Sequence, residues 1–192
     1  GNGWVWASTG ALELYHRIKT GSNDQLSVQY FNSKYQNGGG SNGACCGGWL
    51  SSFTTWYNAD KTVIPLSNTN AGFGDSHSQC GSSTAVPFNT ISTKPNYRIN
   101  TIQSSTIATF GQGQSTAINN IKSALNANKA VVYSFYYGTN GWNAFYNFWD
   151  LSNETAVFDP VLYTSTTQNG GHAVLIVGYD DRNAGNPSWI VL

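Results

Sequence analysis

The sequence predicts an α+β fold, in which a helical first half is followed by a β-rich second half. In the first half, apolar side chains recur at spacings of three and four residues over 4–19, as on one face of an amphipathic helix. In the second half, apolar runs at 130–137, 172–179 and 189–192 have the length and composition of strands. This order of elements fits two lobes that share one cleft.

The helical lobe is expected at residues 1–94. Its first helix should stop at Thr20-Gly21 and bury one face, made of Trp4, Ala7, Ala11, Tyr15 and Ile18. Ser27 is expected to cap a short helix that continues to about Ser33. A further helix over 48–57 should bury Trp49, Phe53 and either Trp56 or Tyr57.

The β-rich lobe is expected at residues 95–192, after a stretch of proline-containing turns over 58–95. A strand over 97–102 should open it. A helix capped by Ser115 follows, with apolar positions at Ile118, Ile121 and Leu125. The three apolar runs then supply the remaining strands, and the sequence contains no internal repeat.

Composition narrows the class of protein. The chain has 192 residues, of which 40% are hydrophobic and 14% aromatic, so it is long and apolar enough to bury a core. Charged residues make up only 9%, against roughly 25% in a typical soluble protein. The net charge is zero, and no basic block or long apolar run is present. These features exclude nucleic acid as a partner and predict no membrane span.

The cysteines and the surface composition indicate where the protein works. Cys45, Cys46 and Cys80 leave one thiol unpaired if a single disulfide forms. Asn153-Glu154-Thr155 is a glycosylation sequon, a triplet that also arises by chance. With Ser, Thr, Asn and Gly in place of charged residues, the composition predicts an extracellular or cell-surface protein.

His172 is the most informative candidate for chemistry. It stands between the flexible pair Gly170-Gly171 and the apolar run that ends at Gly178-Tyr179. This arrangement fixes an imidazole at the end of a strand, where a base or a metal ligand is useful. The competing interpretation is a core histidine that is satisfied by a backbone carbonyl.

Four segments in order resemble the papain-like cysteine peptidases. Gly1-Asn2-Gly3-Trp4-Val5-Trp6 is similar to the end of the family's Cys-Gly-Ser-Cys-Trp-Ala-Phe motif. Gln25-Leu26-Ser27-Val28-Gln29-Tyr30 is similar to its Leu-Ser-Glu-Gln-Tyr helix start. Ala44-Cys45-Cys46-Gly47-Gly48-Trp49 resembles its Gly-Cys-Asn-Gly-Gly turn, and Gly171-His172-Ala173-Val174 resembles its His-Ala-Val strand. The resemblance implies a helical N-terminal lobe, an antiparallel β-barrel-like C-terminal lobe and an active-site cleft between them.

The resemblance also implies the mechanism of a cysteine endopeptidase. It shows as well where this chain differs from the family. His172 corresponds to the general acid/base, and Gly3 stands where the family has its nucleophilic cysteine. A thiol at a helix N-terminus beside an imidazolium has a low pKa and attacks as a thiolate. Glycine has no side chain, so no covalent acyl-enzyme forms at this position and the chain as written is expected to be inactive.

Further family features follow from the same resemblance. The oxyanion Gln and the first motif Cys would precede Gly1, and the orienting Asn would follow Leu192, so we expect a chain clipped at both edges of the site. That first Cys would pair with the cysteine of the Gly-Cys-Asn-Gly-Gly turn, leaving Cys80 to pair with Cys46, although the register between Cys45 and Cys46 is open. Gly47, Gly48 and Trp49 are candidate substrate-binding residues, as a backbone edge for an extended peptide.

Two functions from different classes fit these observations. The first is a papain-like endopeptidase domain that acts on a peptide or protein substrate, with its cysteine replaced by Gly3. The alternative is a non-catalytic relative that binds peptides or cell-surface glycans, and a purely structural module is a third role. A propeptide and additional domains are possible partners, and no cofactor or metal is expected.

The remaining motifs have structural interpretations. His16 and His77 lack a motif and are expected at the surface. The Gly-rich segment 38–43 fits the nucleotide-binding pattern G-x-G-x-x-G, but no predicted strand precedes it, so it is expected to be a loop. Asp180-Asp181 is expected in a solvated turn. The aromatic run over 133–149 is expected in the core and the cleft wall, with a carbohydrate-binding surface as the alternative.

Overall fold

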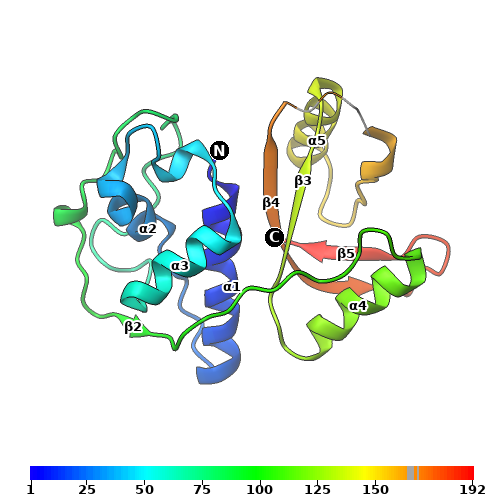
Figure 1. The fold of residues 1–192 in the computed structure, drawn as a ribbon, viewed down its shortest axis with the longest axis horizontal. Coiled ribbons are helices and arrows are strands. Elements are labelled where there is room, and N and C mark those ends of the chain that lie inside the picture. The colour runs from blue at the N-terminus through cyan, green and yellow to red at the C-terminus, as the bar shows by residue number, and fades with distance from the viewer. Residues whose placement is uncertain (164–166, 168) are drawn as a thin grey trace.

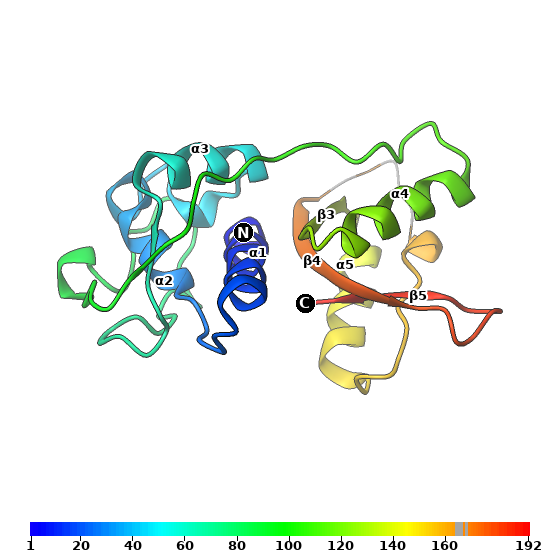
Figure 2. The same ribbon diagram turned by 90° about the horizontal axis from the view of Figure 1, so that it is seen from below.

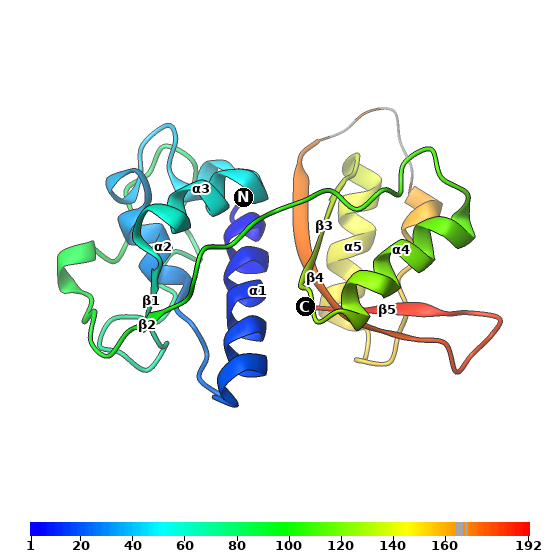
Figure 3. The same cartoon turned by 60° about the horizontal axis from the view of Figure 1, so that its bottom comes forward.

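The computed structural model describes residues 1–163, 167 and 169–192. Its elements form a helical group and a β-containing group, which are joined by a single long segment (Figure 2). Helix α1 (Gly3–Thr20) lies on the inner side of the helical group, and strand β4 (Gly171–Asp180) lies on the inner side of the other group, facing it (Figures 1 and 3). The fold is therefore α+β, as the sequence predicts.

The helical group contains α1, α2 (Val28–Lys34) and α3 (Leu50–Asp60), with short 3-10 turns at Tyr35–Gly38, Ala44–Cys46 and Phe88–Thr90. The expected cap of α2 is confirmed, because the Ser27 hydroxyl accepts a hydrogen bond from the backbone N–H of Tyr30. Helix α1 ends at Gly21, whose φ of 72° suits glycine and whose N–H donates to the carbonyl of Arg17.

The buried face of α1 differs from the expected one. Tyr15 and Ile18 are 41% and 47% exposed, whereas His16, expected at the surface, is buried against the Tyr97 ring. The reason is that α1 packs between two partners, so that it buries a broad surface of Trp4, Val5, Ala7, Ser8, Thr9, Leu12 and His16. Trp49, expected in the core, is also misassigned, since it precedes α3 and is 62% exposed. His77 is exposed, as expected.

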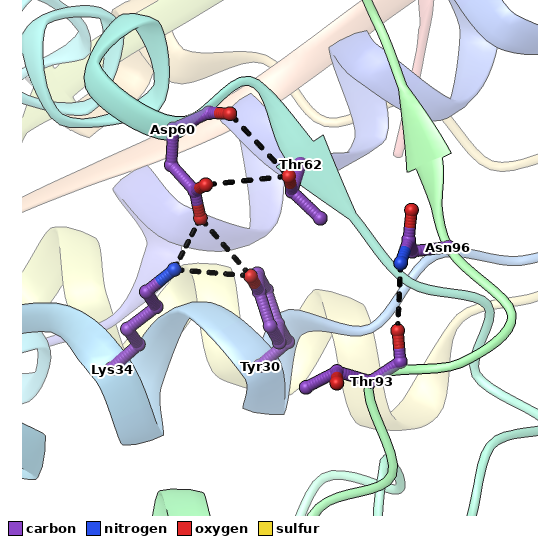
Figure 4. A network of polar contacts seen from close by, with 6 residues as sticks. All are labelled: Tyr30, Lys34, Asp60, Thr62, Thr93 and Asn96. Atoms are coloured by element: carbon purple, nitrogen blue, oxygen red, sulfur yellow. Dashed lines mark hydrogen bonds and ion pairs between the residues drawn. The ribbon is translucent and has the colours of Figure 1, made fainter.

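A polar network fastens α2 to the end of α3 (Figure 4). Lys34 forms an ion pair with Asp60, and Tyr30 donates its hydroxyl to the same carboxylate. The Asp60 backbone carbonyl and carboxylate also accept from the Thr62 hydroxyl at the start of β1 (Thr62–Val63). The network therefore holds together the helical elements that support α1.

The second group is built on one antiparallel sheet in the order β3-β4-β5, with β3 at Val131–Tyr136 and β5 at Ser188–Val191. Helix α4 (Gln114–Asn126) and helix α5 (Thr139–Leu151) lie on the side of β4 away from α1 (Figures 1 and 2). A last 3-10 turn covers Pro160–Tyr163.

Two expectations for this group are corrected. The described residues form no closed barrel, because three strands leave the outer edges of β3 and β5 open. The second is an element that was not predicted, because residues 139–149 of the aromatic run belong to helix α5, which continues to Leu151. Two boundaries also shift: α4 begins after Gly113 rather than Ser115, and the expected strand over 97–102 is reduced to β2 (Tyr97–Arg98), which pairs with β1.

The chain still belongs to the first core after β2. Ile99 is buried in that core, and Ile102 packs against it. The Tyr57 hydroxyl donates to the carbonyl of Ile99, and the side chain of Asn58 exchanges hydrogen bonds with the backbone of Ile102. In the described part of the chain, no helix is long and apolar enough to cross a membrane.

Candidate functional site

The fold brings Gly3 and His172 into contact. Gly3 is the first residue of α1, and His172 is the second residue of β4. A Cβ atom added to Gly3 would overlap Nδ1 of His172, would lie 2.6 Å from its Cε1, and would lie 3.2 Å from the backbone N of Ala173. Figure 1 shows the start of α1 facing the start of β4. The imidazole therefore fills the space into which any side chain at position 3 would point.

Local geometry fixes His172 at the end of the sheet. The backbone N–H of Asn169 donates to the Tyr137 carbonyl, and the Asn169 side chain donates to the Thr139 hydroxyl. These two hydrogen bonds tie the residues before β4 to the residues that follow β3. Gly170 has a φ of 122°, which favours glycine. Gly171 pairs with Tyr136 and lies so close to its ring that an added Cβ would come within 2.7 Å. Each glycine of the pair is therefore needed for the turn into the strand.

The surroundings of His172 are apolar. Its ring makes edge-type contacts with Phe135, Trp142 and Phe145, at centroid distances of 5.6, 6.2 and 5.8 Å. Burial among these rings lowers the pKa of His172, and the positively charged N-terminus lowers it further. The His172 side chain makes no hydrogen bond to any described residue. The apolar surroundings therefore favour the neutral form of the imidazole.

Trp4 connects Gly3 to the turn at 44–48. Its indole N–H donates to the Ala44 carbonyl at 2.9 Å, and its ring packs edge-on against Phe31 and Tyr35. Gly48 lies against the same ring, where an added Cβ would come within 2.6 Å of Trp4. The chain's N-terminal ammonium also donates to the Cys45 carbonyl at 2.5 Å. The start of α1 and this turn therefore form one unit.

The turn presents an open backbone edge beside the site. Gly47, Gly48 and Trp49 are exposed, and Trp49 has an extended backbone with φ −117° and ψ 154°. Neither the N–H nor the carbonyl of Gly48 is hydrogen-bonded to a described residue. These free groups are the kind that pair with an added strand.

The cysteines adopt the pairing implied for Cys80. Cys46 and Cys80 form a disulfide, and Cys45 is free. Burial raises the pKa of the Cys45 thiol, and the charge of Asp75 raises it further, against a smaller opposing effect of the N-terminus. A thiol of this kind is a poor nucleophile at neutral pH.

Two polar groups near the site were not found from the sequence. The side-chain amide of Asn2 and the indole N–H of Trp142 are buried without a hydrogen-bond partner among the described residues. Asn2 carried no signal beyond its place before Gly3, and Trp142 was one of many aromatic residues in its segment. No group of His, Cys, Asp and Glu in the described ranges could hold a metal ion. The site therefore combines one imidazole with one exposed backbone edge.

Comparisons with known proteins agree with this architecture. The structure is similar to that of "proCathepsin B S9 from Trypanosoma congolense", with a TM-score of 0.57 and 18% sequence identity. The similarity covers 99% of this chain but only 57% of that one, and at this identity it shows the papain-like fold alone. No curated protein sequence matches the chain. The model of the Peptidase_C39 like family matches residues 21–187, which include His172 but not Gly3. The chain thus belongs to the Peptidase_C39 like family, and its fold resembles that of the papain-like cathepsin B.

Proposed function

We propose that this chain is a papain-like cysteine endopeptidase domain that has lost its nucleophile and therefore binds peptides without cleaving them. His172 takes the position of the general acid/base, and Gly3 takes the position of the cysteine. The observation that carries the proposal is the direct contact between the first residue of α1 and the imidazole of β4. A cysteine at this place would have both the helix N-terminus and the histidine beside it.

The missing thiol accounts for the loss of chemistry. In the complete reaction, a thiolate attacks the scissile carbonyl carbon, and the imidazolium gives its proton to the leaving amine as the C–N bond breaks. Water, deprotonated by the neutral imidazole, then attacks the thioester and releases the acid. With Gly3 there is no atom to form the acyl bond, and loss of the nucleophile costs a peptidase about a millionfold in kcat.

Peptide binding does not depend on the thiol. The exposed backbone of Gly47, Gly48 and Trp49 supports an assignment of this edge as the place where an extended peptide pairs with the domain. Gly48 lacks a side chain because the Trp4 ring lies beneath it, so the backbone edge remains flat and accessible. The proposed substrate class is therefore an extended peptide or an unfolded segment of a protein.

The expected environment is outside the cell. The Cys46–Cys80 disulfide supports this proposal, because such bonds persist in oxidising compartments. The sparse charge of the chain, 9% of its residues, points the same way.

Replacement of Gly3 tests the function. In a chain extended at both ends, the Gly3→Cys variant should hydrolyse a mixed peptide library in the presence of a reducing agent, and an alkylating reagent should abolish this activity. The same extended chain with Gly3 unchanged, with Gly3→Ser or with Gly3→Cys/His172→Ala provides the matched controls, which should be inactive. Hydrolysis with Gly3 unchanged, or an extended Gly3→Cys variant that folds and is inactive, would contradict the proposal.

A further inference from the structure

An aromatic stripe extends from His172 along α5. It consists of Trp142, Phe145, Tyr146 and Trp149, which follow the i, i+3, i+4, i+7 spacing of one helix face. We call these four residues the α5 stripe. The inner pair, Trp142 and Phe145, contacts the His172 ring, at 6.2 and 5.8 Å between centroids. The stripe is therefore continuous with the candidate site.

The ring contacts continue outward along the helix. Trp142 lies 5.8 Å from Tyr146, and Phe145 stacks on Trp149 at 6.0 Å with an angle of 22° between the planes. Exposure increases in the same direction, because the inner pair is half-buried whereas Tyr146 and Trp149 are 58% and 57% exposed. The stripe therefore begins in the core and ends as an apolar surface.

The outer pair is not needed to hold α5 in place. Phe145 and Phe148 pack on Phe158. Trp142 packs on Phe135 and Tyr137, and these contacts together hold α5 against the sheet without the outer pair. Tyr146 and Trp149 have no comparable cover from the rest of the described chain. Adjoining exposed aromatic rings beside a candidate site are typical of a binding surface.

The dimensions of the stripe match a short peptide segment. Trp149 lies seven positions after Trp142, which corresponds to about 10 Å along a helix. An extended peptide covers this length in about three residues. All four side chains of the stripe are uncharged, so it favours large apolar or aromatic side chains over charged ones.

We propose that the α5 stripe determines the specificity of the peptide site. It binds a large apolar or aromatic side chain located within about three residues of the point where the peptide passes His172. This inference rests on the proposed function, since it names the peptide class that the same site takes. Tyr146 and Trp149 are the specificity-determining residues because they supply the exposed rings.

Peptide binding to the chain with Gly3 in place tests the inference without any need for catalysis. The probes are two blocked hexapeptides that are identical except for a central Phe-Phe or Ala-Ala pair, measured by calorimetry. The Phe-Phe peptide should bind at least about tenfold more tightly. Tyr146→Ala and Trp149→Ala should each reduce this preference by about fivefold to tenfold and leave the Ala-Ala peptide unaffected. Phe110→Ala is the matched control, because Phe110 is a fully exposed aromatic residue in a different part of the fold.

The outcomes separate this inference from the proposed function. Equal affinity for the two peptides, or a preference that survives both alanine variants, overturns the role of the stripe even if Gly3→Cys hydrolyses peptides. If Gly3→Cys is inactive while the preference is present and depends on Trp149, the proposed catalytic ancestry fails and the stripe is retained. Binding of a chitin or cellulose oligosaccharide that depends on Tyr146 and Trp149, without peptide binding, overturns the inference in favour of a glycan surface. Circular dichroism of each variant confirms that it is folded.

Discussion

A cysteine introduced at Gly3 should be far more reactive at acidic pH than an ordinary thiol. Its Cβ would overlap Nδ1 of His172 and would lie 2.6 Å from Cε1, whereas an ordinary contact begins at 3.4 Å. The ring must therefore withdraw by more than 3.4 − 2.6 = 0.8 Å, because Nδ1 is closer still. A displaced ring costs about 0.5–1.5 kcal/mol in a non-ideal rotamer. The thiol then lies directly beside the imidazole.

Electrostatics favours the ion pair over the neutral pair. Two unit charges 4 Å apart attract by about 4 kcal/mol at an effective dielectric constant of about 20. This attraction exceeds the rotamer cost, and it also opposes the burial that lowers the pKa of His172 in the unmodified chain. Each pKa unit corresponds to about 1.4 kcal/mol, so the attraction is enough to lower the thiol pKa and raise that of the histidine.

Alkylation by iodoacetamide measures the effect. At pH 6, a thiol whose pKa falls from about 8.5 to about 6 has about 150-fold more thiolate, offset about 13-fold by weaker nucleophilicity. The net expectation is a rate about tenfold higher than that of a free thiol. A short blocked cysteine peptide in the same solution is the free-thiol reference. Cys45 is a slow internal control, since burial and Asp75 raise its pKa and keep it protonated at this pH. Mass spectrometry of the two cysteine-containing peptides gives both rates from one sample.

The variant His172→Ala in the Gly3→Cys background provides the decisive comparison. It should return the reactivity of residue 3 to that of an ordinary thiol. A rate at pH 6 that matches the free thiol, or that is unchanged without the imidazole, would refute the placement of His172 as the partner of this position.

Three further predictions concern stability. The double variant Cys46→Ser/Cys80→Ser opens a loop with a sequence separation of 34, and it should lower the free energy of unfolding by about 4 kcal/mol. Tm should fall by about 8–16 °C, and no change in Tm would contradict the loop-closure account. Gly48→Ala should lower the free energy of unfolding, measured with urea, by about 1–3 kcal/mol because the added Cβ meets the Trp4 ring. Gly72→Ala is the neutral control, because a Cβ added at Gly72 has no atom within 4 Å. Burial opposes the ionisation of Asp75, but hydrogen bonds from Ala85, Gln29, Asn32 and Thr84 outweigh it and lower its pKa. The stability that Asp75 contributes is therefore present above its unfolded pKa and lost as pH falls through the lower folded pKa. Asp75→Asn should therefore flatten the acid limb of stability against pH, measured by urea unfolding over the acid range, and an unchanged slope would contradict this account.

Local signals predicted the elements whose causes are local. The cap at Ser27 and the strand at Gly171–Asp180 follow from side-chain chemistry and a continuous apolar run, and the structure confirms both. The face of α1 was not predictable in this way, because its burial is set by two partners that are distant in sequence. Helix α5 was missed because its aromatic residues favour strands by intrinsic propensity, although Trp142, Phe145, Tyr146 and Trp149 follow the helical spacing.

The candidate site shows the same division. His172 was found from its position between a glycine pair and an apolar strand, a signal that lies within ten residues. Its contact with Gly3 was inferred only through the resemblance, since glycine carries no chemical signal and the two residues are 172 − 3 = 169 positions apart. The α5 stripe required the structure, because its spacing has meaning only once the segment is known to be helical.

The absence of a side chain at residue 3 changes the physical character of the site as well as its chemistry. With a thiolate beside it, His172 would be held as a cation, and the surrounding rings of Phe135, Trp142 and Phe145 would oppose that charge. With Gly3, the same rings favour the neutral imidazole, which fills the space beside residue 3 and contacts Trp142 and Phe145 of the α5 stripe. Under the proposed function, the imidazole forms the inner end of an apolar surface. The absence of one side chain would then remove cleavage and leave the surface for peptide binding in place.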